Sequence, residues 1–186
     1  NGTLNTEAIA GTAPRGNNSA EDARLAAELI SSDKQMREHR AVADTIAAQL
    51  AALGLDAGEM PRPRLLRLAN AQHIRTPFSA ELPEGMHILD IATALHPTPA
   101  TAGLPRDIAR TTLAKIEETR RGLYSGLIGW LDANEGGELL VALRSGFVED
   151  NLATLHAGAG IVEGSAPTEE VEETALKMSA LARALG

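Results

Sequence analysis

Aromatic residues and cysteine are scarce in this chain. Only 2% of its 186 residues are aromatic, and none is cysteine. The missing cysteine excludes disulfides and thiolate chemistry. The shortage of aromatic rings means that aliphatic side chains must fill the core. Because 44% of the residues are hydrophobic, one domain of this length can still bury a substantial core.

A long apolar run and a basic face are also missing. No segment approaches the roughly 18 continuous apolar residues that a membrane helix needs, and we expect no signal peptide. The formal net charge is −8, and acidic and basic residues are scattered, whereas a nucleic-acid surface needs a basic patch. We therefore expect a cytoplasmic protein that binds neither membranes nor nucleic acid.

The hydrophobic pattern predicts strands mixed with helices. Helices are predicted at residues 20–30, capped by Ser19, and at 34–53, 86–95, 107–120 and 168–185. Strands are predicted at residues 6–10, 65–74, 76–82 (interrupted by Pro77), 123–131, 138–147 and 152–162. The last three strands have the spacing of an antiparallel meander. Because residue 1 is Asn and a strand follows at once, we expect this chain to be part of a longer protein.

Three polar residues stand out from their apolar surroundings. Glu38 lies one turn before Val42 on the apolar side of its helix, where a carboxylate needs a partner or a cation unless the helix start is wet. Arg144 interrupts the apolar segment VALRSGF, and the fork of arginine suits a carboxylate. His73, near the end of its strand, is by its position alone more typical of a structural histidine than of a catalytic one.

The last helix has two readings. Glu173 and Lys177, four residues apart, fit an ion pair on its surface, or they form an anion site with the preceding AGAG segment, where glycines let a ligand approach the backbone. An apolar seam on another face is predicted to pack inward: Val171, Ala175, Met178, Ala182 and Leu185. The GAG segment lacks the GxGxxG spacing, and the chain has no P-loop or HExxH motif.

Seven segments, in order, resemble the chorismate-utilising enzymes, most closely their isochorismate synthase branch. They cover nearly the whole chain, so the resemblance does not depend on any single motif. The segments are AIAGTAPRG (8–16), KQMREH (34–39), QHI (72–74), LHPTPATAGLPRD (95–107), RGLYSGLIGW (121–130), VALRS (141–145) and HAGAGIVEGSAPTEEVEETALK (156–177).

The resemblance implies a fold and a set of roles. The fold would be α/β in the broad sense (α+β), an antiparallel β-sheet sandwich with flanking helices, of which residues 1–186 form the C-terminal half. Magnesium would bridge the substrate carboxylate with Glu38 and Glu173, and Glu170 would lie near the metal. His73 would be an active-site histidine near the reacting part of the substrate. Substrate-binding positions would be Gly11, Thr12, Ala100, Tyr124, Arg144, Ala157, Gly158 and Lys177.

The branch and the activity follow from the same resemblance. Ala100 in the PTPA loop favours isochorismate synthase, although Thr101 departs from the usual apolar residue. The expected reaction is magnesium-dependent isomerisation of chorismate to isochorismate, for menaquinone or siderophore synthesis. Salicylate, anthranilate or aminodeoxychorismate synthesis are alternatives. The general base and general acid of the family would lie outside this chain, so we expect the chain alone to be inactive, with the missing half or a second copy as its partner.

Overall fold

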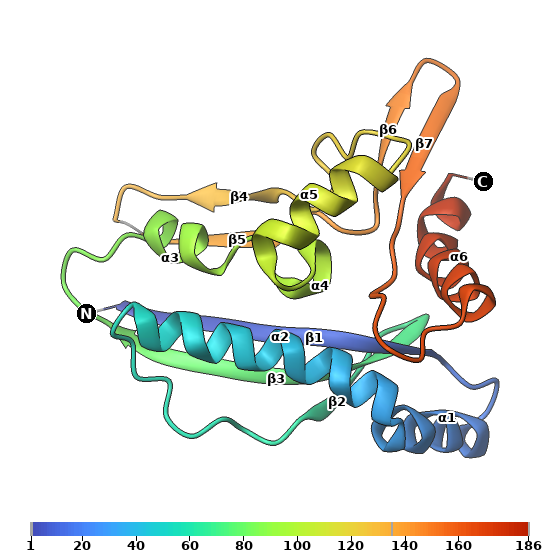
Figure 1. The fold of residues 1–186 in the computed structure, drawn as a ribbon, viewed down its shortest axis with the longest axis horizontal. Helices are drawn as coiled ribbons and strands as arrows, with labels where there is room; N and C mark the ends of the chain where they lie inside the picture. The colour runs from blue at the N-terminus through green and yellow to red at the C-terminus, as the bar shows by residue number, and fades with distance from the viewer. Residues whose placement is uncertain (1, 135, 186) are drawn as a thin grey trace.

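The computed structural model describes residues 2–134 and 136–185. A three-stranded antiparallel sheet, in the order β1-β3-β2, crosses the lower half of Figure 1. Its strands are β1 (Gly2–Pro14), β2 (Arg64–Arg67) and β3 (Ala71–Leu82). The first strand is longer than the predicted strand at residues 6–10, because it also includes residues 2–5 and 11–14.

The strand predicted at residues 65–74 is instead a hairpin. The chain reverses between β2 and β3, where the Leu68 N–H donates to the Ala71 carbonyl at 2.8 Å. Pro77 does not interrupt β3. Because β2 pairs with β3 only at residues 72–75, that edge is open at Pro77, where a missing N–H is tolerated.

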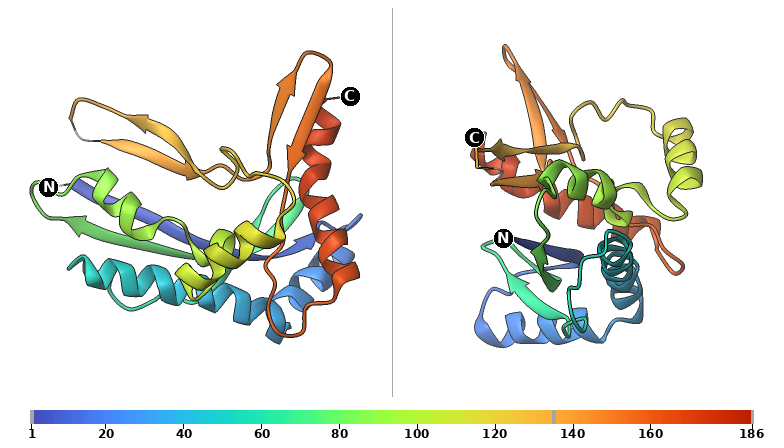
Figure 2. Two further views of the ribbon diagram at one scale, coloured as in Figure 1. Left: turned by 45° about the horizontal axis from the view of Figure 1, so that its top comes forward. Right: turned by 90° about the vertical axis from the view of Figure 1, so that its left-hand side faces the viewer.

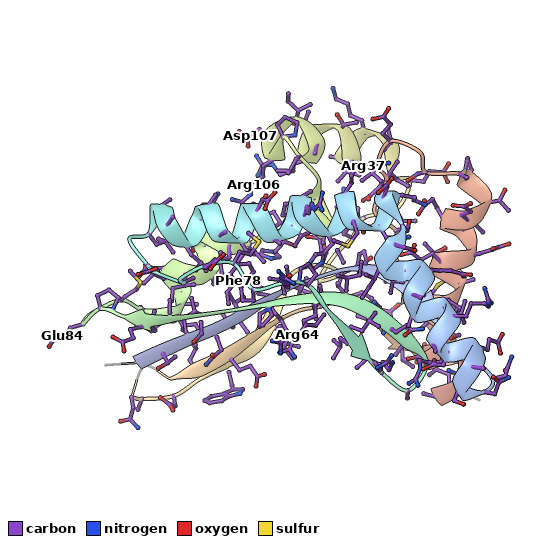
Figure 3. All side chains as sticks on the ribbon, turned by 90° about the horizontal axis from the view of Figure 1, so that it is seen from below. Arg37, Arg64, Phe78, Glu84, Arg106 and Asp107 are labelled. Carbon is purple, nitrogen blue, oxygen red and sulfur yellow. The ribbon has the colours of Figure 1, made fainter. Side chains whose placement is uncertain are left out.

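Helices α1 (Ser19–Ser31) and α2 (Asp33–Ala52) confirm two predicted helices and cover one face of the sheet. The cap of α1 is Asn18, not Ser19, because the Asn18 side chain accepts the Glu21 N–H at 3.0 Å. In the main core, Val42 and Ile46 of α2 pack with Ala8 of β1 and Phe78 of β3. Figure 3 shows Phe78 between α2 and the strands.

A second layer lies above the sheet in Figure 1. It contains the hairpin of β4 (Leu127–Leu131) and β5 (Gly137–Val141) with three helices, α3 (Ile88–Leu95), α4 (Pro99–Ala102) and α5 (Arg106–Ile116). A separate hairpin, β6 (Ser145–Glu149) with β7 (Leu152–His156), points away from it (Figure 2). The predicted meander is therefore wrong. Arg144, with φ at +48°, lies in the bend between the two hairpins rather than inside a strand.

Helix α6 (Pro167–Ala184) stands beside β7 at one end of the sheet. Its charged side faces the rest of the molecule, since Glu170 is only 7% exposed, whereas Val171 is 67% and Leu185 is 54% exposed. The prediction that the apolar seam packs inward is wrong. None of the helices in the described ranges has the length and apolar character needed to cross a membrane.

Candidate active site

A cavity of about 2340 Å³ separates the sheet from the second layer. This exceeds the roughly 300–1,000 Å³ of a typical small-molecule pocket, because the cavity continues along β1 and β3 as far as Gly2 and Met86. Except for Glu170 and Glu173, every site residue expected from the sequence lines it: Gly11, Thr12, Glu38, His73, Ala100, Tyr124, Arg144, Ala157, Gly158 and Lys177.

A β-bulge at Gly11 turns Thr12 into this cavity. Ala10 is paired with Ile74 and faces the core, so regular alternation would turn Thr12 to the core as well. The register shifts between Ala10 and Thr12, which places Thr12 opposite His73. Gly11 occupies the extra position with φ at +77°, a conformation that glycine adopts at little cost. Bulges of this kind re-aim side chains next to functional sites.

His73 is buried between Thr12 and Arg144. Nη2 of Arg144 lies 2.7 Å from Nε2 of His73. On the other side of the ring, Nδ1 of His73 lies 3.2 Å from the Thr12 hydroxyl and 3.3 Å from the Gly11 carbonyl. Burial, and then the charge of Arg144, lowers the pKa of His73 to about 4. The imidazole is therefore neutral near pH 7.

Tyr124 and Ala100 are held in place by Arg121, a residue that sequence reasoning missed. Arg121 donates to the Thr101 carbonyl at 2.6 Å and forms a two-pronged ion pair with Glu117 at 2.6 and 2.8 Å. Its guanidinium carbon lies 6.0 Å from the centre of the Tyr124 ring, a cation–π distance. Arg121 thus links three parts of the chain: the end of α5, the segment that carries Ala100, and the turn that carries Tyr124.

Glu38 and Glu173 face each other from α2 and α6. Burial, and then the charge of Glu173, raises the pKa of Glu38 to about 7. Glu173 forms an ion pair with Lys177 at 2.6 Å, but without hydrogen-bond geometry, so its buried Oε1 lacks a donor. Lys177 donates instead to the Gly158 carbonyl at 2.9 Å. Glu38 and Glu173 are thus two neighbouring carboxyl groups with one lysine in contact, a setting that a further cation would stabilise.

Glu170 has a different partner. Its Oε1 lies 2.5 Å from Nζ of Lys34, which is only 17% exposed and was not singled out from the sequence. In residues 2–134 and 136–185, no three carboxylate or histidine side chains converge enough to hold a metal by themselves. The donor set thus fits magnesium held by Glu38 and Glu173 together with oxygens of a ligand or of water, with Glu170 already neutralised by Lys34.

Gly160 is a further residue that the sequence did not assign to the site. A methyl group at this position would lie 2.8 Å from Cδ of Glu38 and would overlap its Oε1. A methyl group on Gly158 would meet the Tyr124 hydroxyl at 3.0 Å. The AGAG segment therefore lets the backbone approach both the carboxylate and the phenol, and the glycine spacing was the signal for it.

The whole chain, residues 1–186, matches the family described as chorismate binding enzyme. The chain belongs to that family. Isochorismate synthase DhbC of Bacillus subtilis is 40% identical over 179 residues, which are 96% of this chain and 45% of that protein. Two solved structures are similar: DhbC of Bacillus anthracis (TM-score 0.93, 36% identity, 99% of this chain and 49% of that one) and MenF, the menaquinone-specific isochorismate synthase of Escherichia coli (TM-score 0.86, 35% identity, 99% and 42%).

These members of the chorismate binding enzyme family agree with the mixed architecture of helices and small antiparallel sheets predicted from the sequence. The chain spans less than half the length of each of them. The cavity described above is therefore formed from residues equivalent to only part of each relative.

Proposed function

We propose that this chain is the C-terminal part of a cytoplasmic, magnesium-dependent isochorismate synthase, which converts chorismate to isochorismate. The observation that carries the proposal is that two kinds of group meet at one cavity. Arg144 and Lys177 line the cavity and offer cationic donors for carboxylates. Glu38 also lines it, and Glu173, which faces Glu38 from outside the lining, is the second donor for a cation. A substrate dianion with a metal on one carboxylate matches both sets.

The roles divide between the two carboxylates of the substrate. Arg144, Tyr124 and the backbone around Ala157 and Gly158 would hold the pyruvyl carboxylate. Lys177 would bind the ring carboxylate, which faces Glu38 and Glu173. Magnesium, when bound there, would supply the positive charge that neutralises this carboxylate and fixes its position.

The remaining residues would shape the ring site. Gly11 and Thr12 would lie beside the ring, and Ala100 would leave room for its substituent. His73 would lie near the reacting carbons, but its low pKa and its contact with Arg144 do not suit it to the role of general base in the ligand-free site. The general base and general acid would come from the other part of the protein or, alternatively, from a second copy of the chain.

Chorismate binding to this chain tests the clamp without requiring turnover. Calorimetry should detect binding that is stronger with Mg²⁺ than without it. Arg144→Ala should weaken binding by about tenfold or more, because one charge-assisted contact contributes about 1.5–3 kcal/mol. Arg24→Ala, which alters an exposed pair on α1, is the matched control. Equal affinity of both variants would contradict the clamp.

Turnover separates this proposal from its alternatives. We expect no isochorismate from the 186-residue chain and magnesium-dependent isochorismate from the whole protein. Products formed with and without ammonia would identify a salicylate, anthranilate or aminodeoxychorismate synthase instead. Isochorismate made by the chain alone would overturn the assignment of the acid and base to another part of the protein.

A further inference from the structure

The contact between Arg144 and His73 fixes the tautomer of His73. Arginine has only donors, so the Arg144 Nη2 must donate and His73 Nε2 must accept across their 2.7 Å contact. The single ring proton of the neutral histidine is therefore on Nδ1, where it faces the Gly11 carbonyl at 3.3 Å. The bulge at Gly11 thus selects the tautomer that exposes a lone pair to Arg144.

The contact is unusual for a cation. Among the ion pairs of the described residues, none joins Arg144 to a carboxylate. Arg144 also has a positive φ of 48°, a conformation that is strained for a non-glycine residue. The guanidinium is therefore held toward the cavity by a neutral acceptor. A neutral nitrogen is a weaker partner for it than an anion would be.

We propose that His73 is a positioning residue that holds Arg144 in the ligand-free site and gives it up to the carboxylate of a bound ligand. This rests on the proposed function only for the identity of the ligand. A carboxylate accepts both prongs of the guanidinium fork, whereas His73 accepts one, so the exchange favours the anion. Once Arg144 turns away, the lone pair on His73 Nε2 is free to accept a proton or a substrate hydroxyl.

The charged groups around His73 predict the direction in which ligand binding changes its pKa. Arg144, from the bend between the hairpins, and Lys177, from α6, both disfavour its protonation, while the Gly11 carbonyl favours it. Glu38 of α2 lines the same cavity. A ligand carboxylate that pairs with Arg144 offsets one cation and adds no new one. Its binding should therefore make His73 more basic and should be accompanied by proton uptake at mildly acidic pH.

Nitrogen-15 NMR of the five histidines tests the resting contact first. The His73 signals, assigned with His73→Asn, should show a proton on Nδ1. Arg144→Met should raise the pKa of His73 by about one pH unit, and Arg24→Met should leave that pKa unchanged. Arg144→Lys, with circular dichroism to verify folding, tests whether the fork is needed. A proton on Nε2 of His73 in the ligand-free chain would contradict the hydrogen bond from Arg144. An unchanged pKa of His73 in Arg144→Met would contradict it as well.

Titration with chorismate, and separately with pyruvate, tests the exchange. Either carboxylate should raise the pKa of His73 in the wild type by about one pH unit and should leave it unchanged in Arg144→Met. Sodium chloride is the control for ionic strength. A response to pyruvate but not to chorismate would refute the proposed substrate while supporting the exchange. If the pKa of His73 stays unchanged at saturating concentrations of both carboxylates, the proposed exchange is wrong.

Discussion

Lys34 and Glu170 are 136 residues apart in the chain, and their charged atoms are 2.5 Å apart. Their side chains are 17% and 9% exposed. Lys34 lies one turn before Glu38 on α2, and Glu170 lies one turn before Glu173 on α6. This ion pair therefore links the two helices that carry the proposed magnesium-binding carboxylates.

Lys34→Met should destabilise the chain strongly, because it leaves Glu170 buried without a partner. Loss of one member of a buried pair costs about 3–5 kcal/mol, which urea unfolding can measure. Lys34→Met combined with Glu170→Met should recover much of this loss, since no unpaired charge remains. The exposed pair Arg24 and Glu28 is the control and should contribute about 1 kcal/mol or less. Equal losses in the single and double variants would show that the pair does not act as a unit.

Glu38→Gln should change how stability depends on pH. The pKa of Glu38 is about 7, against an ordinary value of 4.5. Between these values the folded chain keeps a proton that the unfolded chain releases, so folding weakens as the pH rises through this window. From pH 4.5 to 7, the wild type should lose about 3 kcal/mol relative to Glu38→Gln, as measured by urea unfolding at each pH.

Magnesium supplies the control for this pH effect. Above pH 7, Mg²⁺ should restore stability to the wild type, where Glu38 is ionised, and should do little for Glu38→Gln. Parallel pH profiles for the two proteins would argue that Glu38 titrates normally. Equal stabilisation of both by Mg²⁺ would argue that the metal binds elsewhere.

The sequence indicated the charged and the apolar face of a helix, but not which of the two faces packs against the rest of the protein. In α6 the helical spacing separated a charged face from an apolar one correctly. The rule that apolar faces pack inward then failed, because α6 lies against Lys34 and Gly158, which are the partners of its charged residues. Such partners lie far away in the chain, so no local pattern reveals them.

The strands show the same limit at shorter range. Alternation identified the strand before Gly11 but could not predict the bulge that extends β1 and turns Thr12 toward His73. Likewise, the apolar run around Arg144 predicted one strand, whereas a single residue with positive φ divides it. The family resemblance, which depends on side-chain identity and order rather than on periodicity, named the residues that line the cavity even where the local structure was wrong.

Gly160→Ala should disturb the metal site while leaving the fold intact. The added methyl group would overlap the Glu38 carboxylate, which can move, so the free energy of unfolding should change by about 1 kcal/mol or less. Displacing a metal ligand should weaken Mn²⁺ binding, measured by electron paramagnetic resonance, by about tenfold or more. Gly158→Ala is the matched control, because its methyl group meets Tyr124 instead. Equal Mn²⁺ affinity in the two variants would contradict a role for Glu38 in metal binding.

Tyr124 is the single tyrosine of the chain, so ultraviolet absorbance of tyrosinate reports on this one site. Burial raises the pKa of Tyr124, Arg121 lowers it and Glu117 raises it. Arg121→Met should therefore raise the pKa further, because the nearby cation is lost, whereas Glu117→Gln should lower it. Arg120→Met changes an exposed neighbour and should have no effect. Opposite shifts from the two test variants, within the pH range where circular dichroism shows a folded chain, are the signature of an arginine held against the ring. Shifts in the same direction would mean that both substitutions merely loosen the turn that carries Tyr124.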